Sequence, residues 1–158
     1  MPEYTWLISA VVAWIIFFLL VDWSRLKYTL WGGLFVVALQ LLVDSGAMDL
    51  NLYHVNILVK FLNSSVFFTF GVVFVVGVLF AQTLPSSRWL QALDILVTTA
   101  LFCWLESLFV KVGVLEYINW NQAASTAINF LAITSYAWLV DSLGLNQAGS
   151  RGIGRYKL

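Results

Sequence analysis

Five long apolar segments alternate with shorter polar ones along the chain, and this pattern predicts membrane-spanning helices. The segments cover about residues 5–21, 29–43, 64–81, 89–112 and 123–140. A helix needs about 20 mostly apolar residues, with a range of about 17 to 25, to cross the hydrocarbon of a bilayer. Lipid satisfies no backbone polar group and no closed barrel fits this length, so each segment should be helical. The expected fold is an all-α, polytopic membrane bundle of five helices.

The chain is expected to form one transmembrane domain at residues 1–145, followed by a basic, glycine-containing tail at residues 146–158. The first apolar segment is interpreted as a retained span. A signal peptide needs basic residues before its apolar core, whereas here Arg25 and Lys27 follow it. We find no internal repeat in the sequence.

The basic residues predict that the amino terminus lies outside and the carboxyl terminus in the cytoplasm, because cytoplasmic loops are enriched in Lys and Arg. In this orientation only Lys60 and Lys111 lie outside. The basic residues placed inside are Arg25, Lys27, Arg88, Arg151, Arg155 and Lys157. The aromatic residues expected at the two interfaces are Trp6, Tyr117 and Trp120 outside, and Trp23, Trp89 and Trp138 inside.

The composition supports a membrane protein and excludes several classes of function. Hydrophobic residues make up 61% and charged residues 10%, whereas soluble domains are about half apolar and about a quarter charged. The net charge is zero and no run of Lys or Arg occurs, which excludes nucleic-acid binding. Cys103 is the single cysteine, so neither an intrachain disulfide nor a metal site is expected.

One carboxylate, Glu106, interrupts the apolar stretch LFCWLESLFVKVG at residues 101–113. At 100° per residue, Thr99, Cys103, Glu106 and Gly113 share one helix face. Most of these residues are small, and small residues let helices approach closely. We therefore expect Glu106 to point into the bundle, within hydrogen-bonding reach of a residue from another span.

Polar residues from four predicted spans fall at the same depth as Glu106, in the outer half of the membrane. Gln40 and Asn129 are its expected hydrogen-bonding partners, and His54 could fold over the group from the long outer link. The candidate ligand- or ion-binding residues are Glu106, Gln40, Asn129, Gln122, Ser125, Thr69, His54 and Trp120.

Two interpretations of this polar group remain open. In the first, the residues satisfy one another between helices, each contact contributes about 0.6 to 2 kcal/mol, and Glu106 is a protonated structural residue. In the second, they line an outward-facing pocket in which Glu106 binds a cation, takes up a proton or holds a polar head group. An intramembrane charge costs roughly 2.5 to 3.5 kcal/mol, which makes such a carboxylate a candidate functional residue.

The other acidic residues near span ends have simpler interpretations. The tripeptide LVD recurs at residues 20–22, 42–44 and 139–141, where its aspartates are expected to mark the water boundary. Asp94 is expected to complement the positive amino-terminal end of its helix.

The expected function is non-enzymatic binding of a small ligand or a membrane partner protein through the pocket around Glu106. No hydrolase, metalloprotease or nucleotide-binding motif occurs, although an intramembrane enzyme that uses Glu106 as an acid remains open. The alternative is a small proton- or cation-coupled carrier that uses Glu106. The expected partners are the lipid bilayer and either a membrane protein or a second copy of the chain, and no cofactor is indicated.

Two stretches and one serine carry a resemblance to known proteins. VDWSRLKY at residues 21–28 and ESLFVKVGVLEYINW at residues 106–120, with Ser125 after them, resemble a group of small five-span membrane proteins of spore-forming Gram-positive bacteria. The resemblance covers most of the chain. It implies a five-span architecture in a bacterial plasma membrane, and it suggests that Glu106 and Trp120 form one feature at the outer face. That group has no assigned activity, so the resemblance implies no chemistry.

Overall fold

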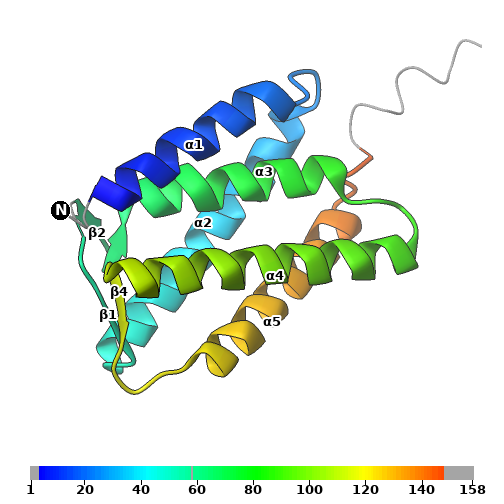
Figure 1. The fold of residues 1–158 in the computed structure, drawn as a ribbon. Helices are drawn as coiled ribbons and strands as arrows, with labels where there is room; N and C mark the ends of the chain where they lie inside the picture. The colour runs from blue at the N-terminus through cyan, green and yellow to red at the C-terminus, as the bar shows by residue number, and fades with distance from the viewer. Residues whose placement is uncertain (1–3, 58, 148–158) are drawn as a thin grey trace, which may run out of the picture.

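A computed structural model describes residues 4–57 and 59–147, and most of these residues are helical, as predicted (Figure 1). The helices are α1 (Tyr4–Leu20), α2 (Leu26–Asp49), α3 (Phe74–Thr83), α4 (Arg88–Val112) and α5 (Gln122–Ser142). A π-helical segment, η1 (Phe68–Val73), leads directly into α3. The predicted tail at residues 146–158 lies outside the described residues except for its first two.

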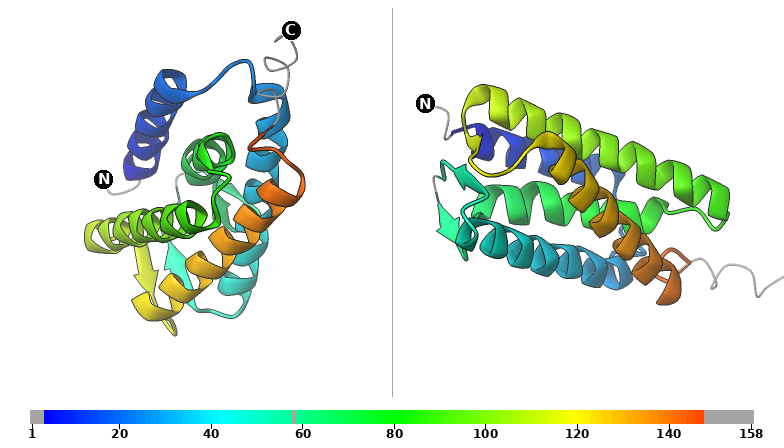
Figure 2. Two further views of the ribbon diagram at one scale, coloured as in Figure 1. Left: turned by 90° about the vertical axis from the view of Figure 1, so that its right-hand side faces the viewer. Right: turned by 90° about the horizontal axis from the view of Figure 1, so that it is seen from below.

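Successive helices run in opposite directions between two ends of the molecule (Figure 1). One end holds the start of α1 and all the strands, and the other holds the loops after α1 and α3 and the end of α5. Tyr4 and Ser142 therefore lie at opposite ends. In Figure 2, α5 crosses α2 obliquely, so the two helices diverge toward the strand-bearing end.

Three of the helices, α2, α4 and α5, are long and apolar enough to cross a membrane. Large apolar side chains are exposed on their outer faces, for example Leu42, Trp104 and Leu131. Exposed apolar surface of this extent is expected where a helix contacts lipid. The helices α1 and η1–α3 are also apolar but shorter. The prediction of apolar membrane-type helices is thus confirmed for three segments.

Two short antiparallel sheets lie at one end of the bundle, where the sequence predicted only links. Strand β1 (Tyr53–Val55) pairs with β4 (Leu115–Tyr117), and β2 (Lys60–Phe61) pairs with β3 (Ser64–Ser65). Alternation along β1 places Tyr53 and Val55 toward the bundle and leaves His54 exposed. The sheet β1–β4 therefore closes this end of the bundle and aims Tyr53 inward.

Two predicted span boundaries are corrected by the structure. The second span, predicted at 29–43, is a helix over Leu26–Asp49, because Asp44 is buried and does not mark its end. The third, predicted to begin at residue 64, begins as a helix at Phe68. The turn between β2 and β3 explains the difference, because φ is positive at both Leu62 (46°) and Asn63 (64°), as in a two-residue hairpin of type I′.

Glycines allow the helices of one half of the bundle to approach closely. A Cβ atom on Gly71 of η1 would lie 2.6 Å from the Cβ of Ala10 on α1. A Cβ on Gly77 of α3 would lie 3.1 Å from the Cα of Gly33 on α2. Contacts this close are what small residues provide between membrane helices. They hold α1, α2 and η1–α3 together as one packed group.

The opposite end of the bundle is held by charged and polar contacts between loops and helix ends. The Arg25 guanidinium group donates to the carbonyl oxygens of Gln82 (2.9 Å) and Asn146. Arg88 forms an ion pair with Asp141 (3.2 Å). These contacts link the loop after α1 to the end of α3, and the start of α4 to the end of α5.

Candidate functional site

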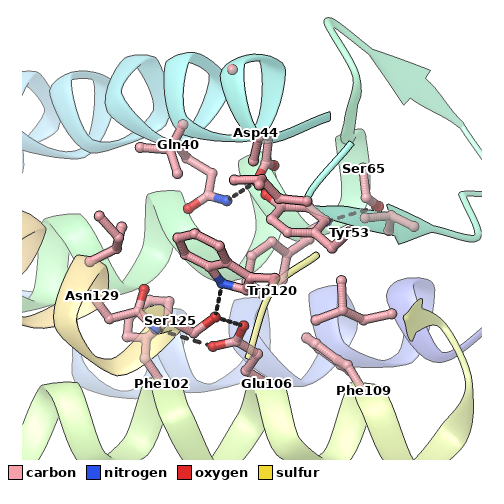
Figure 3. A pocket seen from close by; sticks show the side chains of 18 of the residues that line it. Gln40, Asp44, Tyr53, Ser65, Phe102, Glu106, Phe109, Trp120, Ser125 and Asn129 are labelled. Carbon is pink, nitrogen blue, oxygen red and sulfur yellow. Dashed lines mark hydrogen bonds between the residues drawn. The ribbon is translucent and has the colours of Figure 1, made fainter. Parts of the chain in front are cut away.

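Glu106 points from α4 toward α5 and accepts hydrogen bonds from three side chains (Figure 3). Its Oε1 accepts from the hydroxyl groups of Tyr117 (2.9 Å) and Ser125 (2.6 Å). Its Oε2 accepts from the amide of Asn129 (3.2 Å). Ser125 and Asn129 lie on α5, so the expected inward orientation and the expected contact with Asn129 agree with the structure.

Trp120 determines how the hydrogen bonds around Glu106 are directed. Its indole N–H can only donate, and it donates to the Ser125 hydroxyl at 2.7 Å. The Ser125 oxygen is therefore an acceptor from Trp120, and its own proton is free to be donated to Glu106. Asn121, which caps α5 by accepting from the Ala124 N–H (2.9 Å), positions Trp120 just before that helix. The loop and the helix start thus orient the carboxylate together.

A second carboxylate, Asp44 on α2, lies in the same region and is only 8% exposed. Its Oδ1 accepts from the Gln40 amide (2.8 Å) and the Tyr53 hydroxyl (2.6 Å), and its Oδ2 accepts from the Ser64 hydroxyl. The Ser64 oxygen is also 2.6 Å from that of Thr69. Residues from α2, β1, β3 and η1 therefore converge on one buried carboxylate.

The interpretation of Asp44 as a boundary marker is wrong. Asp22 is exposed and accepts from the Ser24 hydroxyl, and Asp141 pairs with Arg88, which fits a position at the water boundary. Asp44 differs because α2 continues past it and the two strands bring donors to it. The spacing of Gln40 and Asp44, four residues apart on a helix, is the signal that could have indicated a paired carboxylate.

The two carboxylates line one cavity of about 320 Å³ between α2, α4 and α5. In Figure 3, Asp44 belongs to the α2 side and Glu106 to the α4 side. Most of the remaining wall is apolar or aromatic. The aromatic lining residues are Trp6, Tyr53, Phe68, Phe102, Phe109 and Trp120. No Lys, Arg or His is found among the described residues that line this cavity.

The other predicted site residues divide between the two carboxylates. Gln40 lines the cavity but bonds Asp44 and not Glu106, which corrects the expected pairing. Thr69 is buried and contacts the Asp44 group through Ser64. Gln122 lies beside the Glu106 group, with its Oε1 at 3.2 Å from the Tyr117 hydroxyl. His54 does not join the site, because its side chain is exposed on the outer face of β1.

Two tyrosines at the site remain protonated donors at neutral pH. Burial raises the pKa of Tyr117, and the hydrogen bond to Glu106 and the charge of Glu106 add to this rise, so that the pKa is about 12. Burial also raises the pKa of Tyr53 well above its ordinary range, and the charge of Asp44 adds to this rise. Neither tyrosine was among the predicted site residues. The alternating stretch YHV, with Tyr53 on its inward-facing side, was the available signal.

No known protein family, curated protein or solved structure matches this chain. Among the described residues, no three His, Cys, Asp or Glu side chains gather in a group that could hold a metal ion. The chemistry that the site itself offers is electrostatic. It presents two carboxylates, each oriented by three donors, to a mostly apolar cavity.

Proposed function

We propose that the protein is a non-enzymatic membrane protein that binds a small organic cation in the cavity between Asp44 and Glu106. The observation that carries the proposal is the pairing of two carboxylates across one cavity whose described lining residues include no basic side chain. A ligand with a positive charge supplies the counter-charge that the walls lack. Aromatic faces also attract organic cations, and the cavity has a size suited to a small molecule.

The ligand is proposed to carry an apolar part as well as a charge. The cavity extends to Leu42 and Gly46 on α2 and to Ile128 on α5. Leu42 is 72% exposed and Ile128 is 37% exposed, so both side chains reach the outer surface of the bundle. In a bilayer this side opens to lipid, and an apolar group placed there loses contact with water. An amphiphilic amine or quaternary ammonium ion satisfies both conditions.

The proposed setting is a bacterial plasma membrane crossed by all five helical segments, with the strand-bearing end outside. The shorter segments α1 and η1–α3 run between the same two ends as the three long helices (Figure 1). At about 1.5 Å per residue, the 17 residues of α1 extend about 25 Å, which a locally thinned bilayer accommodates. The resemblance to five-span proteins of spore-forming bacteria supports the same setting.

Binding can be tested by calorimetry on the detergent-purified protein with benzyltrimethylammonium. Its neutral isostere, neopentylbenzene, has the same shape without the charge. We expect the cation to bind at least tenfold more tightly than the isostere. Glu106→Gln should weaken cation binding about tenfold, or about 1.4 kcal/mol. The variant should still fold, because the Asn129 amide can turn its oxygen toward the new amide group.

Glu116→Gln provides the matched control, because Glu116 is exposed on β4 and does not line the cavity. It should leave the affinity for benzyltrimethylammonium unchanged. Equal affinities for the cation and its isostere, or equal losses in the two variants, would contradict the proposal. Binding of a membrane protein in place of the small cation would then become the better explanation of the cavity.

A second candidate function is a proton- or cation-coupled carrier that uses Glu106. It is favoured by one specific observation, a further carboxylate, Asp94, within α4. The Asp94 Oδ2 atom is buried and has no hydrogen-bonding partner among the described residues.

A further inference from the structure

We propose that the bundle also contains a proton path, which runs from Asp94 through three adjoining cavities to Glu106. The path goes beyond ligand binding, because it involves Asp94 and two cavities that the proposed cation site does not use. It needs no bound ligand. Each end of the path is a carboxylate, and polar side chains and space for water lie between them.

Asp94 does not have the role that the sequence predicted for it. The favourable effect of an acidic side chain on a helix dipole is confined to the first turn, whereas α4 begins at Arg88, six residues earlier. Its Oδ2 is buried without a partner in the described part of the chain. A buried carboxylate oxygen with no donor near it is costly to retain. Such an atom points to a water molecule or a proton as its missing partner.

The first of the three cavities, the Asp94 cavity, is lined by Asp94 itself. It has a volume of about 210 Å³ and lies between α3 and α4, and its polar lining residues are Asp94, Thr98 and Thr83. Thr83 is exposed at the end of α3, on the side of the bundle that carries the loops after α1 and α3. Asp94 can therefore exchange protons with that side of the molecule.

A middle cavity of about 70 Å³ adjoins both the Asp94 cavity and the cation site. It shares Thr98 and Phe102 with the Asp94 cavity, and Gln40, Phe102 and Asn129 with the cavity of the cation site. This volume is large enough for more than one water molecule. The side chains of Thr98, Gln40 and Asn129 give those waters polar partners. Phe102 borders all three cavities and is placed to narrow the path where they meet.

Water is required because the two carboxylates are far apart. Glu106 follows Asp94 by twelve positions on α4, which corresponds to about 18 Å along the helix. In the proposed transfer, the Asp94 carboxyl group gives its proton to a cavity water, and a proton passes along the waters to the Glu106 carboxylate. Asp94 then takes up a proton from its own side, and Glu106 releases one to the cavity of the cation site. Only O–H bonds form and break, and the net result is one proton moved.

The test uses the full-length protein in vesicles that contain a pH-sensitive dye. A potassium gradient with valinomycin drives protons inward and supplies the compensating charge. We expect wild-type vesicles to acidify faster than protein-free ones. Asp94→Asn and Glu106→Gln should each lower the protein-dependent rate at least fivefold. Asp49→Asn is the matched control, because Asp49 is exposed at the end of α2, and it should keep the wild-type rate.

Phe102→Ala gives an independent check, because widening the constriction should raise the rate. A circular-dichroism spectrum and thermal unfolding equal to those of the wild type will verify that Asp94→Asn is folded. A wild-type rate no faster than that of protein-free vesicles, or an unchanged rate in Asp94→Asn, would overturn the proton path. If the wild-type protein conducts protons but binds no cation, the path stands and the cation-binding proposal fails. If it binds the cation but conducts no protons, the reverse holds.

Discussion

The Glu106 group is organised by which of its side chains can donate a proton and which can accept one. The Trp120 indole N–H is only a donor, so it fixes Ser125 as the donor to Glu106. Tyr117 has a single hydroxyl proton and two acceptors in reach, Glu106 at 2.9 Å and Gln122 at 3.2 Å. The hydrogen bond to a charged acceptor is the stronger of the two. Tyr117 is therefore held as a donor to Glu106.

Ionisation of Tyr117 is a direct measure of this arrangement. We expect one tyrosine of the folded protein to ionise at about pH 12, and Tyr117→Phe should remove that step from the ultraviolet titration of tyrosinate. The unfolded chain loses this proton near pH 10. The contribution of Tyr117 to the free energy of unfolding is therefore fully present below about pH 10, and it declines as the pH rises from about 10 to 12. A titration of Tyr117→Phe identical to that of the wild type would contradict this prediction.

Sequence reasoning found Glu106 but missed Asp44, and the two cases differ in a physical way. Glu106 is far from either end of its apolar segment, so its cost in lipid is visible from the sequence. Asp44 ends an apolar run, and the same pattern appears at Asp22 and Asp141, which do contact polar surroundings. Apart from Gln40 four residues earlier, what distinguishes Asp44 from the other two is the strands, which bring Tyr53 and Ser64 back over α2.

At the scale of helices and strands, apolar length predicted the existence of each helix but not where α2 ends or where the helical segment after β3 begins. Hydropathy records the cost of leaving water, and it does not detect polar residues that find partners inside the protein. For this reason α2 continues six residues beyond the predicted end at residue 43. The strands were missed because each is two or three residues long and gains its partner from a distant segment.

The contact between α1 and η1 depends on Gly71. Gly71→Ala should lower the free energy of unfolding by about 1 to 3 kcal/mol, because the new Cβ would lie 2.9 Å from the Ala10 Cα and nearer still to its Cβ. Unfolding by sodium dodecyl sulfate, followed by circular dichroism, measures the change. Gly46→Ala is the control, because a Cβ there meets no atom within 4 Å. It should be neutral or stabilising by up to about 1 kcal/mol.

Ala10→Gly should restore part of the stability lost in Gly71→Ala, since it removes the nearer of the two clashing atoms. The two substitutions should therefore be non-additive, as expected for residues in direct contact. Additive effects, or equal stability of Gly71→Ala and the wild type, would indicate that α1 is not packed against η1 at this point.

At the scale of the whole molecule, the two ends of the bundle differ in kind. One end carries the strands, both carboxylates of the cation site and the exposed residues Lys60 and Lys111. The other end carries Arg25 and Arg88, which bind helix ends and loops. The cavity between Asp44 and Glu106 therefore lies toward the strand-bearing end only. The proposed proton path would connect this cavity to the opposite end of the bundle. Which end faces the outside of the cell decides the direction from which a ligand arrives.

Cysteine labelling in intact cells determines this orientation. In a Cys103→Ala background, we expect Glu116→Cys on β4 to react with a membrane-impermeant maleimide in intact cells. Ser86→Cys, in the loop between α3 and α4, should react only after the cells are permeabilised. Both positions are exposed, so a difference in labelling reports their side of the membrane and not burial. The reverse pattern would invert the orientation. Labelling of both positions in intact cells would mean that α4 does not cross the membrane, and neither an outward-facing cavity nor a transmembrane proton path would then be tenable.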